Sequence, residues 1–163
     1  MTSTELLALL REFYRDKHAL RQRHVAAARH ISHYDFNNTY QYMINRDDGH
    51  VRWLADAIVD MGGQPEDAPV PDVRLQGKGA QAEAALIAAD RDGARTFVEK
   101  WKGRLEGLPN ARHRSMLRVI VGETLEQQRF FDLALAGRTD LLGRRADGAG
   151  TGGGVLSTRW IEQ

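Results

Sequence analysis

The chain has 163 residues, a length that fits one domain with a full hydrophobic core. Its 23 basic and 22 acidic residues are spread along the chain, so no basic patch argues for nucleic-acid binding. The absence of cysteine excludes disulfides, iron–sulfur clusters and a cysteine nucleophile. No apolar run approaches the roughly 18 residues of a membrane span, and the N-terminus has no signal-peptide pattern. We therefore expect no membrane contact and a cytoplasmic location.

Two helical periodicities fill the first part of the chain. Apolar residues step by three and four from about Thr4 to His33, which predicts a first helix. Asp35 is suited to cap a second helix, and Gly62-Gly63 followed by Pro65 would end it. The short connection between the two predicts an antiparallel hairpin.

The second part of the chain repeats this pattern after a long connection. Residues 64–79 hold three of the four prolines and show no period. A third helix is expected at about residues 80–107, and a fourth follows the turn at Pro109. Short, long and short connections predict an all-α, antiparallel four-helix bundle with a long crossover between the second and third helices. We assign residues 1–142 to this bundle.

The composition changes after Leu142. Glycine dominates residues 143–154, which is typical of a linker. Residues 155–162 then include Val, Leu, Trp and Ile, which are unfavourable to expose. We expect residues 143–163 to be a linker and a C-terminal docking tail, whose docking place, on its own bundle or on another subunit, is left open.

Five ionisable residues fall on the apolar stripes of the predicted helices. The second helix carries Asp47 and His50, the third carries Asp90, and the fourth carries Glu123 and Glu126. A buried, unpaired charge is unfavourable by several kcal/mol, so these groups need a compensating cation. The cation could be a divalent metal, or it could be a buried Lys or Arg.

Spacing along the helices is compatible with a metal. In each of the pairs Asp47/His50 and Glu123/Glu126, the two residues are three apart and share one face of a helix. Lys17 and His24 lie on the inner face of the first helix and are the alternative sources of neutralising charge. The residues alone leave both possibilities open.

The stretches 47–54, 90–94 and 122–126 resemble the metal-binding helices of the ferritin-like superfamily, especially the bacterioferritin and rubrerythrin branches. The family pattern is a Glu on the first and third helices and Glu-x-x-His on the second and fourth. The resemblance implies a core site for iron or manganese and a role in iron or peroxide handling. Its ligands here would be Asp47, His50, Asp90, Glu123 and Glu126.

Several positions depart from the family pattern. Tyr14 stands where the first helix would carry Glu, and Glu126 stands where the fourth would carry His. Asp48 occupies the position of the haem-binding methionine, so no haem is expected. With Lys17 one turn from Tyr14, we expect at most one metal per chain and weak ferroxidase activity. The alternative is a metal-free helical bundle that acts as a structural or interaction module.

The partner of this chain is expected to be a second copy of itself, as a homo-oligomer and most simply a dimer. Four histidines near the end of the first helix could form a second metal site, but solvated or capping roles fit this basic stretch better. They are His18, His24, His30 and His33.

Overall fold

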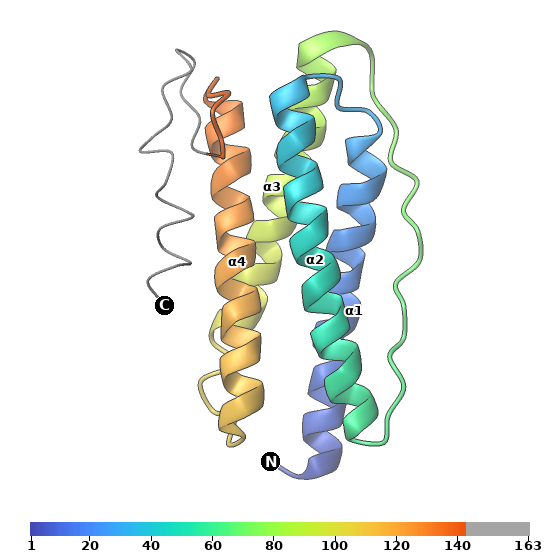
Figure 1. The fold of residues 1–163 in the computed structure, drawn as a ribbon, viewed down its shortest axis with the longest axis vertical. Helices are drawn as coiled ribbons and strands as arrows, with labels where there is room; N and C mark the ends of the chain where they lie inside the picture. The colour runs from blue at the N-terminus through green and yellow to red at the C-terminus, as the bar shows by residue number, and fades with distance from the viewer. Residues whose placement is uncertain (143–163) are drawn as a thin grey trace, which may run out of the picture.

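The structure, a computed structural model, describes residues 1–142. It contains α1 (Ser3–Ala28), α2 (Tyr34–Asp60), α3 (Gly79–Lys102) and α4 (Ala111–Leu135), and no strand occurs among the described residues. The four helices lie side by side along one long axis (Figure 1). The predicted all-α four-helix bundle is therefore confirmed.

The connections give the bundle its topology. A short turn joins α1 to α2 and another joins α3 to α4, so each pair is an antiparallel hairpin. Residues 61–78 form the crossover, which runs along the length of the bundle beside α1 (Figure 1). Because the crossover returns the chain to the end where α2 began, α2 and α3 run in the same direction. This is four-helix topology with one long crossover.

The first hairpin turn differs from the sequence prediction in its helix ends. The first helix ends at Ala28 and not near His33. Asn37 explains the early end, because its side-chain amide donates to the carbonyls of Ala28 and Ile31 at 3.0 and 3.1 Å. His33, rather than Asp35, is the N-cap of α2 and accepts a hydrogen bond from the Phe36 amide.

The third helix is also shorter than predicted. It ends at Lys102, and Gly103 follows as its C-cap. The apolar pattern continues to Leu105 and Leu108, which are buried although they lie in a turn. Their apolar side chains pack into the core from non-helical backbone, so periodicity alone extended the helix too far.

The core consists of two apolar clusters along the bundle axis. One is centred on aromatic residues of α1 and α3, where Phe13 contacts Phe97 and Trp101 at ring distances of 5.1 and 4.7 Å. The other lies towards the opposite end and contains Tyr40, Met43 and Phe131. None of the helices in residues 1–142 is both long and apolar enough to cross a membrane.

Candidate functional site: a buried polar cluster in the bundle core

A lysine from α1 lies in the centre of the bundle. The Lys17 side chain has no exposed surface, and its Nζ is 2.7 Å from Oδ1 of Asp47, which is also fully buried. The same ammonium donates to Oγ1 of Thr124 on α4 at 3.1 Å. Three helices thus meet at one buried cation.

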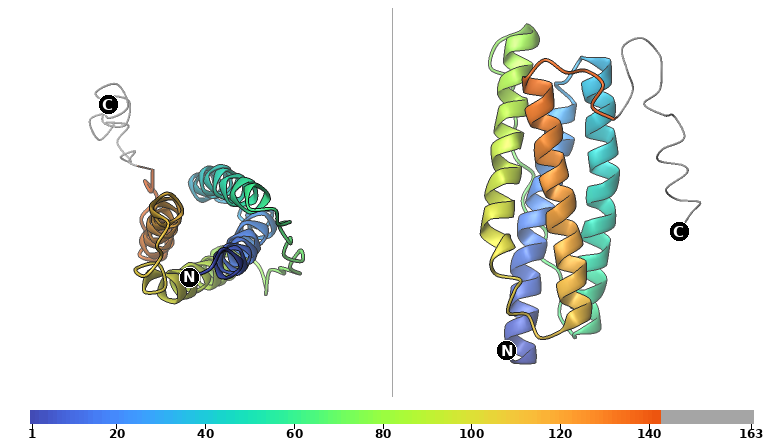
Figure 2. Two further views of the ribbon diagram at one scale, coloured as in Figure 1. Left: turned by 90° about the horizontal axis from the view of Figure 1, so that it is seen from below. Right: turned by 90° about the vertical axis from the view of Figure 1, so that its left-hand side faces the viewer.

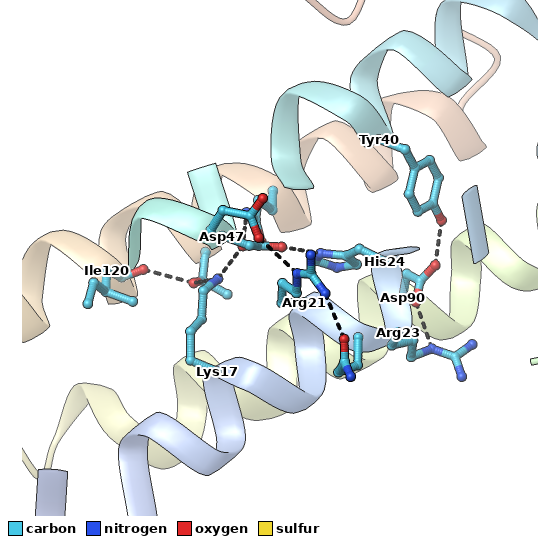
Figure 3. Close-up of polar contacts among 12 residues, drawn as sticks. Lys17, Arg21, Arg23, His24, Tyr40, Asp47, Asp90 and Ile120 are labelled. Atoms are coloured by element: carbon cyan, nitrogen blue, oxygen red, sulfur yellow. Dashed lines mark hydrogen bonds and ion pairs between the residues drawn. The ribbon is translucent and has the colours of Figure 1, made fainter. Parts of the chain in front are cut away.

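Asp47 also accepts hydrogen bonds from two other side chains. His24 of α1 approaches the second carboxylate oxygen through Nδ1 at 2.6 Å, and Gln127 of α4 donates to the first at 2.8 Å. Since a carboxylate only accepts, Nδ1 of His24 must carry the proton. Figure 3 shows Asp47 between Lys17 and His24. Nε2 of His24 is buried without a hydrogen-bond partner.

The charges in this cluster are matched. Burial alone would raise the pKa of Asp47, but the Lys17 ammonium and then His24 lower it by more, so the pKa lies well below its usual range. Asp47 is therefore an anion at neutral pH, held by a cation in direct contact. A buried pair of this kind is stable only when hydrogen bonds satisfy the remaining atoms, as Thr124 and Gln127 do here.

Asp90 of α3 forms a second buried pair beside the first. Nε of Arg23 donates to its Oδ1 at 2.6 Å, and the Tyr40 hydroxyl donates to its Oδ2 (Figure 3). Burial raises the pKa of Asp90, although His24, Tyr40 and Arg23 act in the opposite direction. Asp47 and Asp90 are thus buried as their register predicts, and each is paired with a cationic side chain.

His50 and Glu123 form a third pair, between α2 and α4. Nε2 of His50 contacts a carboxylate oxygen of Glu123, whose other oxygen contacts Arg46. The His50 side chain is buried, whereas Glu123 is about one-fifth exposed. Burial, followed by the nearby Lys17 ammonium, lowers the pKa of His50 to about 3, so the ring is neutral. Its Nδ1 is buried without a partner.

The prediction that Glu126 points into the core is wrong. Glu126 is exposed, and the buried polar residues of α4 are Thr124 and Gln127, each one position further along the chain. A shift of one residue rotates a helix face by about 100°. This register buries two neutral polar side chains instead of two carboxylates, which avoids a large desolvation penalty. Their spacing from Ile120 and Phe131 was the signal that could have identified them.

Tyr14 also departs from its predicted place. It is buried, but its hydroxyl donates to Oδ1 of Asp67 in the crossover at 2.5 Å instead of facing the layer around Asp47. His18 lies beside it, with the rings stacked, and accepts from the Ala68 amide at 2.9 Å. Together they attach the crossover to α1, so this part of the first helix has a structural role.

The remaining histidines of the first hairpin do not gather into a site. His30 contacts the Val73 carbonyl of the crossover at 3.0 Å, and His33 caps α2. His18 and His24 already have the partners described above. The second metal site considered from sequence is thus replaced by capping and crossover contacts, in agreement with the alternative preferred there.

The donor set fits a di-metal centre poorly. Each oxygen of Asp47 and Asp90 already accepts from a protein donor, and two of those donors are the cations Lys17 and Arg23. A metal would bring further positive charge next to a buried ammonium. Among residues 1–142, no group of three or more His, Asp or Glu side chains is arranged to hold one metal ion.

Comparison with known proteins gives a similarity in fold. No protein-family model and no curated protein matches the sequence. A solved structure of a Dps1 variant from Mycobacterium smegmatis superposes with a TM-score of 0.62 and 17% sequence identity. The match covers 82% of this chain and 96% of that chain. At this identity the similarity concerns the fold alone, and the chain accordingly has the four-helix fold of the ferritin-like proteins.

Proposed function

We propose that this protein is a ferritin-like bundle that works without a core metal, as a structural or interaction module. The observation that supports the proposal is the position of the Lys17 ammonium, 2.7 Å from Asp47 and fully buried with it. An ammonium is a compact cation with three donors, so it can neutralise a carboxylate as a metal would. It offers no open coordination position and no redox chemistry.

The first experiment measures the metal content of the full chain purified without chelator. The proposal expects neither iron nor manganese in stoichiometric amount. It also expects no accelerated oxidation of added Fe(II). Stoichiometric iron or manganese in the wild-type protein would contradict the proposal.

A pair of variants at Lys17 tests the reason for this expectation. Lys17→Glu replaces the cation by a carboxylate beside Asp47, so the two anions should repel and the variant should be stabilised by added Mn²⁺. Lys17→Gln removes the cation without adding an anion and is the matched control. We expect Mn²⁺ to raise the melting temperature of Lys17→Glu only. An equal response of both variants would separate metal binding from the charge at this position.

A second candidate function is retained on one observation. His50 is neutral, keeps an unpartnered ring nitrogen and contacts the partly exposed Glu123, so this pair could hold a single iron or manganese ion. The protein would then take part in iron or peroxide handling, as the resemblance implies. Glu123→Ala would abolish metal binding in that case. In the metal-free proposal, Glu123→Gln leaves stability unchanged or increases it, because it removes a half-buried charge.

A further inference from the structure

One side of the bundle, between α2 and α4, exposes an unusual set of apolar side chains. Tyr42 and Trp53 of α2 are 40% and 43% exposed, and Val119 of α4 is 47% exposed. Large apolar side chains that share one face mark an interaction site more often than isolated ones do. We refer to Tyr42, Trp53, Val119 and Phe130 as the α2–α4 face.

Contacts between the two helices place these residues together. The ring of Tyr42 lies 6.1 Å from that of Phe130, and Arg46 contacts Glu123 one helical turn further along α2. Trp53 follows Arg46 by seven residues, which is two helical turns on the same face. Val119 precedes Glu123 by four residues and shares its face in the same way. The face is thus apolar at both ends with an ion pair in the middle.

One end of this face opens into a hollow of about 190 Å³. Its apolar lining comes from α2, α3, α4 and the residues after α4: Phe36, Tyr40, Met43, Ile87, Phe130, Phe131, Ala134 and Leu141. Leu141 is the last residue but one of the described chain. The chain therefore leaves the bundle at the hollow, next to the α2–α4 face, as the end of α4 in Figure 2 shows.

The chain beyond this point has the length and the composition to cover the face. Residues 143–154 can span at most about 40 Å when extended. The rise along α4 from Leu135 back to Val119 is only about 24 Å. Residues 155–162 then supply Leu156, Trp160 and Ile161, apolar side chains that need burial.

We propose that residues 155–162 lie across the α2–α4 face of their own chain. A tethered segment competes at high effective concentration, which favours it over the same segment of another molecule. Because the chain departs at the hollow, Leu156 lies nearest the hollow and Ile161 nearest Val119. The tail predicted from sequence, which lies outside the described residues, thereby acquires a docking place.

Cysteine cross-linking tests this placement, because the natural chain contains no cysteine. The variant Val119→Cys with Ile161→Cys should form an intramolecular disulfide under mild oxidation, seen as a monomer with altered mobility on a non-reducing gel. The matched control is Val70→Cys with Ile161→Cys. Val70 is an exposed valine of the crossover, which lies beside α1 and away from α4 (Figure 1). We expect at least tenfold faster cross-linking at position 119, about the ratio that a 1.4 kcal/mol preference gives. Equal rates at both positions, or disulfide-linked dimers at position 119, would overturn the proposal.

Fluorescence quenching gives a second measurement that needs no cross-link. Trp101 is fully buried, so in a protein lacking Trp160 the indole open to acrylamide is Trp53. Trp160→Ala should release the tail and make Trp53 more accessible to acrylamide. Trp160→Phe keeps an aromatic anchor and should protect Trp53 better. Identical quenching in the two variants would count against docking through residue 160.

Discussion

At the residue scale, the distinctive feature of this protein is a lysine where a ferritin-like core would hold a metal. Lys17 is fully buried and is satisfied by Asp47 and Thr124. Such a pair is not by itself a large source of stability, since desolvation offsets much of the Coulomb attraction. Its consequence is specific: the two side chains depend on each other, and neither can be removed alone without penalty.

The first prediction follows from this dependence. Lys17→Met leaves Asp47 buried without its cation and should lower the free energy of unfolding by about 3–5 kcal/mol. Adding Asp47→Asn should recover most of the loss, because the amide oxygen can still accept from His24 and Gln127. Urea denaturation of the two single variants and the double variant measures the coupling. Additive effects would show that the two side chains do not interact as described.

The second prediction concerns pH and His50. Its pKa is lowered to about 3 in the folded protein, against an ordinary value of 6.5. As the pH falls below 6.5 the unfolded chain gains a proton on this ring that the folded chain does not, so stability is lost down to about pH 3. Between pH about 7 and about 5 this loss is at most about 2 kcal/mol.

The His50→Gln variant provides the control. It keeps a donor towards Glu123 but cannot titrate, so its stability should fall less between pH about 7 and about 5 than that of the wild type. Denaturation curves at both pH values make the comparison. The same loss in both proteins would mean that His50 does not titrate between the folded and unfolded states.

At the element scale, the turn that ends α2 depends on a close approach of the backbone. A Cβ atom on Gly63 would lie 2.7 Å from a methyl carbon of Leu7 and 3.3 Å from the carbonyl oxygen of Ile58. The Gly63 amide donates to that same carbonyl, so the backbone has little freedom to move away. This contact fixes where α2 stops and where the crossover begins.

The third prediction compares two glycines. Gly63→Ala should destabilise the protein by about 1 kcal/mol or more, because a methyl group must be forced against Leu7 and Ile58. Gly49 lies inside α2 with nothing within 4 Å of an added Cβ. Gly49→Ala should therefore stabilise by about 0.5–1 kcal/mol through a reduced entropy of the unfolded chain. Thermal unfolding measures both, and effects of the same sign would contradict the account.

At the scale of the whole molecule, the bundle is expected to hold together without an ion. Buried charges are neutralised inside the chain: Lys17 pairs with Asp47, and Arg23 pairs with Asp90. The predicted homodimer is a separate matter, which light scattering of the purified full chain would measure. A dimer would leave the α2–α4 face free for the tail only if the two copies meet elsewhere.

The fourth prediction is that chelation does not change stability. Removal of divalent ions with a chelator should leave the melting temperature of the wild-type protein unchanged, since a ligand that is not bound cannot stabilise the fold. Dialysis against chelator, followed by thermal unfolding with and without added Mn²⁺, makes the measurement. A lower melting temperature after chelation, restored by metal, would favour a single ion at His50 and Glu123.

The sequence by itself determined the helices, the long crossover and the inward direction of three ionisable side chains. Asp47, His50 and Asp90 lie on helices with one clear apolar stripe, so the period of 3.6 residues sufficed to place them inside. The crossover was evident from its prolines and its lack of period. These features depend on local composition, and local composition is what a sequence displays.

Only the tertiary structure decided the register of α4 and the identity of the core cation. This helix carries two neighbouring stripes, one through Glu123 and Glu126 and one through Thr124 and Gln127, and periodicity cannot choose between them. The choice depends on which side chains of other helices are opposite. Lys17 and Thr124 are 107 positions apart, and their hydrogen bond exists only because the bundle brings α1 and α4 to the same buried carboxylate. A charge can be placed inside from a local pattern, whereas its partner is set by packing.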